Sequence, residues 1–551
     1  VLLPLEVDAA RRLAREVRAR FVEVPCAAAV ALLHSVVESR HEEALGAILR
    51  EEGFEHVALS SRLARSIKIL PRAETAVVEA YLAPVLAGYL AGVSAALTSH
   101  LDPGPGAARS SLHVMTSAGG LVGVEHFHAK DALLSGPAGG VLGAVRAARA
   151  SGITRAIAFD MGGTSTDVAR IDGLPELAFE HRVGAAHLLA PAVAVETVAA
   201  GGGSILSVSE RQGRLQVGPE SAGAWPGPAC YGAGGPLAIT DVNLLLGRLD
   251  GERFGMPLDL AAAERAAARL AEGLGTSTDV SALLSGALEI ANERMAAAIR
   301  TISIAKGYDP ADYTLVAFGG AGAQHACAVA DLLGISTVIV PRDASLLSAF
   351  GLGGASIERF ASRQLLAPLD DVPKLEQELA ALEAEAKGAV AAEGVDPAAI
   401  EIRRRVAHLR FVGQEATVAV ALEDFRRLGA AFLAAYRALY GYVPAGRAIE
   451  IESLVVSAGE VSDREGNSFR EVRPRGTAQP DGTRRAWFSG AFQDVAVYER
   501  KSLAEGDHFV GPCLVFEAHS ATGVEAGWLG WLDGAGAIRL ERGALALAPG
   551  L

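Results

Sequence analysis

The sequence predicts a large protein of the mixed α/β class, and three observations support this. Its 551 residues are enough for roughly three or four domains of ~150 residues each. Half of them are hydrophobic and 62 are glycine, which indicates a well-buried protein with many tight turns. Short apolar runs typical of buried strands alternate with alanine-rich segments typical of helices, the runs being 156–159, 313–318 and 337–340.

Charge and cysteine content exclude some classes of protein. The net charge of -14 argues against a nucleic-acid groove, which needs a basic stripe, so we expect no nucleic-acid partner. The four cysteines lie far apart and form no Cys-x-x-Cys pair, so neither a disulfide framework nor a zinc ribbon is implied. A cytoplasmic protein is therefore the expectation.

The first hundred residues contain two notable segments. A helix is expected to begin near Glu38, with His41, Glu42 and Glu43 as its polar face. The stretch 80–101 carries no full charge and is long enough on paper to span a bilayer. Its proline, its glycines and its many alanines favour a helix packed inside a protein, so we expect no membrane partner.

Residues 155–173 indicate a hairpin with a polar turn. The apolar run 156–159 predicts one strand and 168–171 a second. Glycines at a turn leave no Cβ in the way of an anion, and hydroxyl side chains add donors, so we expect phosphate to bind at Gly162, Gly163, Thr164, Ser165 and Thr166. Two acids flank this turn. Asp160 and Asp167 fit a phosphate site if Mg²⁺ lies between carboxylate and phosphate.

A second glycine turn follows the predicted strand 313–318. It consists of Gly319, Gly320, Ala321 and Gly322, and the helix 324–333 comes next. A strand, a glycine turn and a helix N-terminus make a site of the kind that binds nucleotides, so we assign this turn to the nucleoside. His325, at the start of that helix, is either an acid or base or a hydrogen-bonded core residue.

Between these turns, residues 195–243 are too rich in glycine and proline for a regular helix or a long strand. We expect a structured loop region, in which Gly201, Gly202 and Gly203 are further candidates for nucleotide binding. It also holds Glu196, Cys230 and Asp241, the ligand types of Zn²⁺ or Mn²⁺, which with Asp160 make up the candidate metal ligands. The alternative is a buried free cysteine with solvated acids, because no short ligand pair is present.

The segment from Asp160 to Val168 resembles the second phosphate loop of the superfamily of actin, sugar kinases and heat-shock chaperone ATPases. It is more similar still to the hydantoinase A/5-oxoprolinase branch, and 195–243 matches that branch closely. The resemblance implies actin-like (ribonuclease H-like) ATPase domains with a C-terminal α+β domain. Many relatives have His where Glu196 stands, which weakens the transfer of a family metal site.

The resemblance also implies three domains: the remainder of an N-terminal domain at 1–60, a central domain at 61–360 and the C-terminal α+β domain at 361–551. In that last domain we expect helices at 374–391 and 425–440 and strands at 406–411, 416–422 and 449–457. Similar proteins carry a further Gly-Gly-Thr hairpin before the point that corresponds to Val1. We therefore expect the segment with the first phosphate loop to be missing from this sequence.

In function, the resemblance implies ATP-dependent hydrolysis of a cyclic amide of the 5-oxoprolinase or hydantoinase type. ATP would phosphorylate the substrate oxygen, and a hydantoinase B-type subunit or a fused half would complete ring opening, in an oligomer. Asp160 and Asp167 would be the catalytic acids, with ATP and Mg²⁺ as cofactors. Two alternatives stay open: a subunit of an ATP-dependent acetone or acetophenone-type carboxylase that acts on a ketone, and a non-enzymatic actin-like nucleotide switch.

Overall fold

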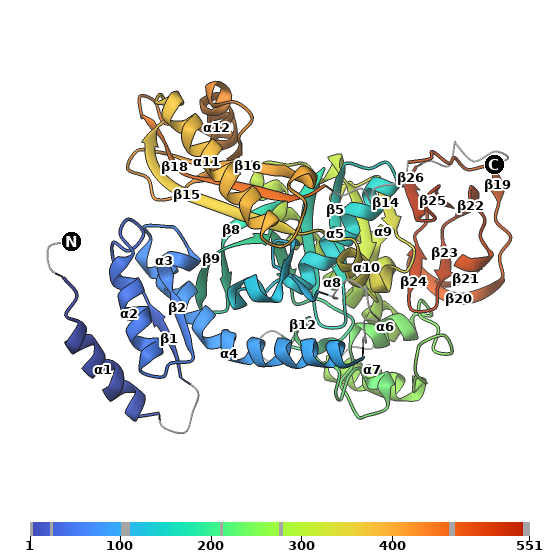
Figure 1. Ribbon diagram of the computed structural model, residues 1–551. Coiled ribbons are helices and arrows are strands. Elements are labelled where there is room, and N and C mark those ends of the chain that lie inside the picture. Colours follow the sequence, from blue (N-terminus) through green and yellow to red (C-terminus); the bar gives the residue numbers. More distant parts are fainter. Residues whose placement is uncertain are drawn as a thin grey trace. The chain divides into compact units, whose positions relative to one another are not determined.

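The computed structural model describes residues 4–21, 26–100, 111–209, 213–274, 279–461 and 469–543. The chain divides into two compact units, each built from segments that are discontinuous in sequence (Figure 1). Unit 1 consists of 1–138, 177–193 and 355–464, and unit 2 of 139–176, 194–354 and 465–551. The three domain boundaries given above stay a prediction.

Unit 1 opens with helices around a small parallel sheet. The elements are α1 (Val7–Ala19), β1 (Ala27–Val30), α2 (Arg40–Glu51), β2 (His56–Leu59), α3 (Ser60–Leu63) and α4 (Ile69–His100). Strand β1 pairs with β2 in parallel, and α4 packs on both. Alanines at 58, 76 and 80 form part of this contact, because small side chains let a helix approach the strands closely.

The expected polar face of α2 is only partly correct. Glu42 is fully buried, and so is Arg72 of α4, whose Nη1 lies 3.4 Å from Oε1 of Glu42. The carboxylate also accepts hydrogen bonds from Ser60 Oγ (2.7 Å) and from the backbone N–H groups of Leu32 and Ser61. A buried charge needs such partners, so Glu42 joins α2 to α4 and does not face solvent.

Helix α4 is long and apolar, as predicted, and Pro84 lies inside it. By length and composition alone, residues Ile69–Leu97 could cross a membrane, and this is the one helix in the described part of the chain that meets this test. Only 11% of its most apolar window is buried. The expectation that this stretch packs inside the protein is therefore wrong for the half of α4 after Ala80, where no described side chain is buried.

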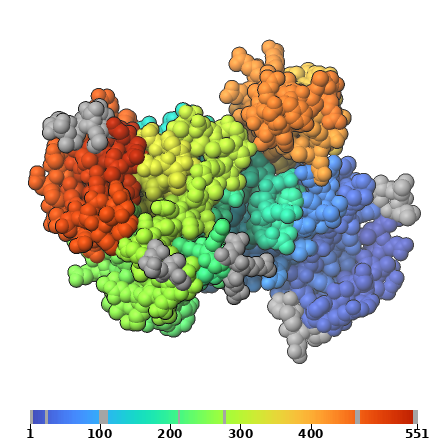
Figure 2. Space-filling model, turned by 180° about the vertical axis from the view of Figure 1, so that it is seen from behind, coloured from blue at the N-terminus to red at the C-terminus, as the bar shows by residue number. Residues whose placement is uncertain are grey.

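The rest of unit 1 consists of two hairpins and an α+β lobe. The hairpins are β3 (His113–Met115) with β4 (Leu121–Gly123), and β8 (Leu177–Val183) with β9 (Ala186–Val193). The lobe holds β15 (Glu358–Pro368), α11 (Val372–Ala391), β16 (Ile400–Phe411), β17 (Val418–Ala421), α12 (Phe425–Tyr440) and β18 (Ile449–Glu460). Its sheet order is β15-β18-β16-β17, and the lobe is the orange body in Figure 2. Both predicted helices and all three predicted strands are confirmed here.

Unit 2 is organised around a ten-stranded sheet. The order is β10-β6-β5-β13-β14-β26-β25-β22-β19, and β7 pairs with β6 beside this path. Its strands are β5 (Arg155–Met161), β6 (Thr166–Asp172), β7 (Leu174–Pro175), β10 (Val195–Val198), β13 (Thr314–Phe318), β14 (Thr337–Val340), β19 (Gly476–Thr477), β22 (Asp507–Val510), β25 (Trp528–Leu532) and β26 (Ile538–Arg542). The predicted hairpin is confirmed, because β5 and β6 pair in antiparallel register.

Helices and smaller sheets complete unit 2. The helices are α5 (Ser135–Ala150), which begins in unit 1, α6 (Ile239–Leu245), α7 (Leu260–Gly273), α8 (Val280–Ile302), α9 (Gly322–Leu333) and α10 (Leu347–Gly353). One small sheet pairs β11 (Ser204–Val208) with β12 (Leu215–Ser221), and the other has the order of β20 (Gly482–Phe488), β21 (Ala491–Glu499), β23 (Cys513–Phe516) and β24 (Ala521–Val524). The described residues of 195–243 therefore form only short elements, as the composition predicts.

Candidate functional site: a carboxylate pair beside two glycine turns

Two carboxylates face each other across the β5–β6 hairpin of unit 2. Asp160 and Asp167 are directly opposed in the antiparallel register. Side chains of opposed residues lie on the same face of the sheet, with their Cβ atoms ~5 Å apart. Like charges in such positions repel each other, so the pair is arranged for a cation or a shared proton.

The surroundings disfavour the charged form of both acids. Burial and the nearby charge of Asp167 raise the pKa of Asp160 to about 6. Burial also raises the pKa of Asp167, against the effect of a hydrogen bond from Oγ1 of Thr197 on β10 (2.5 Å). Thr197 was not predicted from the sequence as part of the site. It is identified only by the strand register, which places it opposite Asp167. A divalent cation would favour the ionised form of both carboxylates.

The turn between the two strands is open at its tip. Gly163 and Thr164 are exposed, and a Cβ placed on Gly163 would meet no atom within 4 Å. Gly162 N–H closes the turn on the Ser165 carbonyl (3.0 Å). Thr166 differs from the prediction: it is fully buried and donates its hydroxyl to the Ala200 carbonyl (2.5 Å), so that this hydroxyl is already engaged inside the protein.

Gly201, Gly202 and Gly203 pack underneath the turn. Gly202 N–H donates to the Gly162 carbonyl (3.0 Å), and Gly203 N–H to the Gly163 carbonyl (2.5 Å). A Cβ on Gly201 would lie 2.6 Å from the carbonyl carbon of Thr164. These backbone donors are occupied, so this segment sets the shape of the turn.

The second glycine turn comes to the same edge of the sheet. Strand β13 runs parallel to β5, and Phe318 is the register partner of Asp160. The next residue, Gly319, has a φ of +80°, and a Cβ there would lie 2.4 Å from Oδ1 of Asp160. Ala321 N–H donates to the Met161 carbonyl (3.0 Å), whereas Gly320 has open space around it. The structure therefore brings both predicted turns together around Asp160.

Two helices approach this edge. Helix α9 begins at Gly322 without a side-chain cap, and its positive N-terminal end lies at this edge. On α5, a Cβ at Gly140 would lie 3.1 Å from Oδ2 of Asp160. Gly140 therefore allows α5 to pack closely against the acid itself.

His325 is a core residue. Burial, with the charge of Arg248, lowers the pKa of His325 to about 3, which keeps the ring neutral. Its Nδ1–H donates to Oδ1 of Asn292 (2.7 Å), and Nε2 accepts from Nδ2 of Asn243 (3.3 Å). Of the two readings, the hydrogen-bonded core residue fits this geometry. The two asparagines that hold the ring come from α8 and α6, and the sequence offers no signal for either.

The expected metal cluster does not form. Asp241 is fully buried, and its carboxylate accepts N–H groups from Ala229, Cys230 and Ala238 at 2.7–3.0 Å, so it organises the loop before α6. Cys230 is buried, and desolvation together with Asp241 raises the pKa of its thiol, which disfavours the thiolate that a metal needs. Glu196 is exposed on β10. No disulfide joins the four cysteines, all of which lie in the described ranges.

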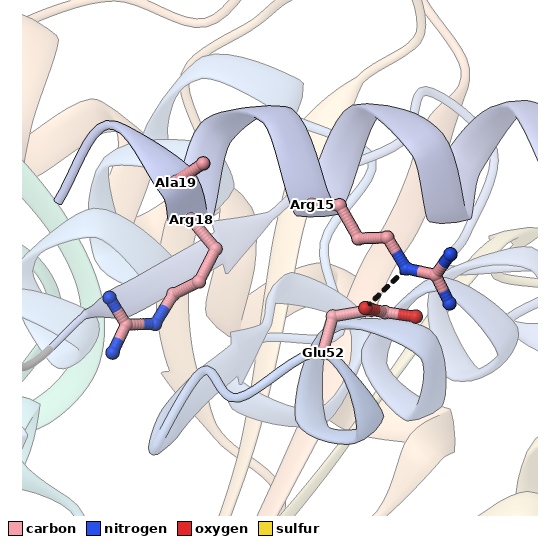
Figure 3. A pocket seen from close by; sticks show the side chains of 4 residues that line it. All are labelled: Arg15, Arg18, Ala19 and Glu52. Carbon is pink, nitrogen blue, oxygen red and sulfur yellow. Dashed lines mark hydrogen bonds and ion pairs between the residues drawn. The ribbon is translucent and has the colours of Figure 1, made fainter. Parts of the chain in front are cut away.

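A shallow hollow in unit 1 does not compete with this site. It is lined by Arg15, Arg18, Ala19 and Glu52 (Figure 3). Nε of Arg15 donates to Oε2 of Glu52 (2.8 Å), and Arg18 donates to the carbonyls of Gly53 and Phe21. Its guanidinium groups thus already have protein partners, which leaves little to attract a phosphate.

The fold and the site together define a mixed α/β protein with a carboxylate pair between two glycine turns. The sequence profile of the Hydantoinase/oxoprolinase family matches residues 72–360, more than half of the chain. The chain belongs to this family. This confirms the resemblance on which the sequence interpretation rests.

Relatives and solved structures agree with this membership. A 5-oxoprolinase of Dictyostelium discoideum is 33% identical over 95% of this chain and 43% of its own length. The caprolactamase subunit alpha of Pseudomonas jessenii is 32% identical over 94% of this chain and 76% of its own. The crystal structure of the ATP-dependent caprolactamase from that organism superposes with a TM-score of 0.86 at 30% identity, covering 98% of this chain and 80% of the other. The chain thus spans about two fifths of the oxoprolinase.

Proposed function

We propose that this chain is the ATP-binding component of an ATP-dependent enzyme that opens cyclic amides. The observation that carries the proposal is the Asp160–Asp167 pair, with its raised pKa values, beside an open glycine turn and a second turn at the end of the adjacent parallel strand. The names of the relatives supply the reaction class, since they include a 5-oxoprolinase and an ATP-dependent caprolactamase.

The residues fit a nucleotide with its metal ion. Asp160 and Asp167 would hold Mg²⁺, because a divalent cation would neutralise the repulsion between their two carboxylates. Bound there, Mg²⁺ would supply charge neutralisation for the phosphates of ATP. Gly163 and Thr164 would contact phosphate at the exposed tip of the turn, and Gly319–Gly322 with the start of α9 would hold the nucleoside.

Within this proposal, unit 2 is an actin-like ATPase fold of the ribonuclease H-like type. Its antiparallel β5–β6 hairpin beside the parallel strands β13 and β14 supports this, as does the glycine turn that follows β13. The phosphate turn and the nucleoside turn would then serve one nucleotide. The lobe of β15–β18 with α11 and α12 would be the C-terminal α+β domain.

The chain would work with a second component. One relative is called a subunit alpha, which supports a hetero-oligomer with a hydantoinase B-type subunit or a fused half. The activated amide must be consumed by hydrolysis, and we assign that step to the partner. A cytoplasmic location belongs to the same proposal and is supported by the lack of disulfides among the described cysteines.

Substrate-dependent ATP turnover tests the proposal. The chain, co-purified with its B-type partner, is mixed with Mg-ATP and 5-oxoproline, a hydantoin or caprolactam, and ADP and ring-opened product are measured together. We expect one lactam to stimulate ADP release with matching product. ADP release that depends instead on a ketone and bicarbonate would support the carboxylase alternative and overturn the lactam assignment. Nucleotide binding without turnover on any of these substrates would support the switch alternative.

A further inference from the structure

A cluster of three metal-ligating side chains lies in unit 1 and shares no residue with the hairpin site. Glu125 and His126 come from the single 3₁₀ turn Val124–His126, and Glu393 follows α11. Their ligand atoms all lie within 4.8 Å of one another, and this is the one such group in the described ranges of the chain. The cluster joins the end of the β3–β4 hairpin to the α+β lobe.

Glu393 is the anchor of the cluster. Its side chain is only 1% exposed, although carboxylates are rarely buried so deeply. Oε1 accepts from Nη1 of Arg359, and Oε2 accepts from Gly123 N–H (2.9 Å). A carboxylate oxygen can accept two hydrogen bonds, so each oxygen of Glu393 retains a free lone pair.

His126 points a ring nitrogen at this carboxylate. Nδ1 lies 3.2 Å from Oε1 of Glu393. The atom is buried, and yet no group in the described part of the protein completes a hydrogen bond with it in acceptable geometry. A buried nitrogen without a partner requires an explanation, and an ion is one of the common ones.

Glu125 adds a second carboxylate close to Gly123. A Cβ built on Gly123 would lie 2.8 Å from Oε2 of Glu393 and 2.9 Å from Oε1 of Glu125, so both acids converge over this residue. Arg359 bonds one of the two carboxylates, and Glu125 has no ion pair with a described residue. The cluster thus has net negative charge and an acceptor atom from each of three side chains.

We propose that Glu125, His126 and Glu393 bind a first-row divalent cation such as Zn²⁺ or Mn²⁺. One imidazole nitrogen and two carboxylate oxygens are a donor set that these ions take in proteins. Arg359 and Gly123 N–H orient Glu393 and so act as positioning groups. The ion links segments that lie some 270 residues apart in sequence, between Gly123 and Glu393, and its role is to fasten the hairpin to the lobe.

A spectroscopic titration with Co²⁺ tests the site without any assay of activity. The full chain is stripped with chelator and titrated with Co²⁺ in the absence of nucleotide, and visible absorption is recorded. We expect one equivalent to give a d–d band without the near-ultraviolet band of a thiolate, and Zn²⁺ to displace it. Glu125→Gln should weaken binding by about tenfold or more. Glu125 is exposed, so this replacement leaves the packing intact.

The matched control is His128→Gln. His128 lies two residues further along, and its Nδ1 contacts Oε1 of Glu79 (3.2 Å) outside the cluster. This variant should bind Co²⁺ like the wild type, and His126→Gln should lose the band. If the wild type gives no d–d band, or if Glu125→Gln and His126→Gln both bind with wild-type affinity, the site is refuted. Added Zn²⁺ should also raise the Tm of the wild type but not that of Glu125→Gln.

Discussion

At the scale of single residues, Asp160 is the group on which most of the proposed chemistry depends. It lies opposite Asp167, next to the Cα atoms of Gly140 and Gly319, in a setting that disfavours its charge. Asp160→Asn should lower lactam-dependent ATP hydrolysis by at least about 100-fold, because a cation would lose a charged ligand. Asp172→Asn is the matched control, since it lies at the exposed end of β6, the other strand of the hairpin. If both folded variants hydrolyse ATP at the same lactam-dependent rate, Asp160 is not part of the catalytic site.

The same residue predicts a pH effect on stability. The pKa of Asp160 is raised from 3.8 to about 6 in the fold, so the folded state binds this proton more tightly than the unfolded chain. Its ionisation therefore lowers the free energy of unfolding as pH rises through that window. Without nucleotide or metal, Asp160→Asn should gain more in Tm over the wild type at about pH 7.5 than at about pH 5. A gain independent of pH in thermal unfolding would refute this.

The sequence predicted several of these residues but not their contacts. The turn, both acids and the second glycine turn follow from local pattern, because they lie in one hairpin and in one strand-to-helix connection. The hydroxyl of Thr166 and the donors of Gly202 and Gly203 are used by partners some 34–40 residues away. No local pattern encodes such pairing. For the same reason, the sequence predicted Glu42 on a polar helix face although its partner Arg72 buries it.

At the scale of elements, the turn after β13 must come very close to β5. Gly319→Ala would place a Cβ 2.4 Å from Oδ1 of Asp160 and 2.5 Å from the Met161 carbonyl, at a φ that alanine disfavours. We expect a loss of at least about 1 kcal/mol in the free energy of unfolding, together with weaker nucleotide binding. Gly320→Ala is the control for stability, because its Cβ meets no protein atom and should change the free energy of unfolding little. Similar behaviour of the two variants in denaturant unfolding would exclude this role for Gly319.

The joint between α2 and α4 predicts a larger loss. Glu42→Gln would leave Arg72 fully buried without its counter-charge, and breaking such a pair from one side costs about 3–5 kcal/mol. Glu43→Gln is the control, since its bridge to Arg62 is largely exposed and should contribute less than about 1 kcal/mol. Chemical denaturation measures both. If the two variants have the same midpoint, the buried pair does not join the helices as described.

At the scale of the whole molecule, His325 and three cysteines of unit 2 are poorly suited to open a ring. His325 is buried and neutral, and Cys230, Cys327 and Cys513 are buried with raised thiol pKa values. We therefore expect ring opening of a lactam only when a B-type partner is added, while the chain alone consumes little ATP. Mixing purified components and following ring-opened product measures this. Full activity of the chain alone would refute the two-component reading.

The α/β class and the helices at 324–333, 374–391 and 425–440 could be predicted from the sequence. Hydrophobic periodicity and glycines at turns are local signals. The division into two units could not be predicted, because each unit collects segments from both halves of the chain. Strand β15 was also not anticipated. It is held by pairing with β18, about ninety residues later, and its own alternation is weak.

The order in which the strands of the large sheet are synthesised affects how the chain folds. Strand β14 has β13 on one side and β26 on the other, and β26 is made some two hundred residues after it. Until Ile538–Arg542 leave the ribosome, the apolar edge of Val338, Ile339 and Val340 has no strand to cover it. An open apolar edge is a template for pairing with other chains. We expect a nascent chain or a truncation that ends before β26 to depend on chaperones and to aggregate, whereas one that includes Arg542 folds with this edge already closed.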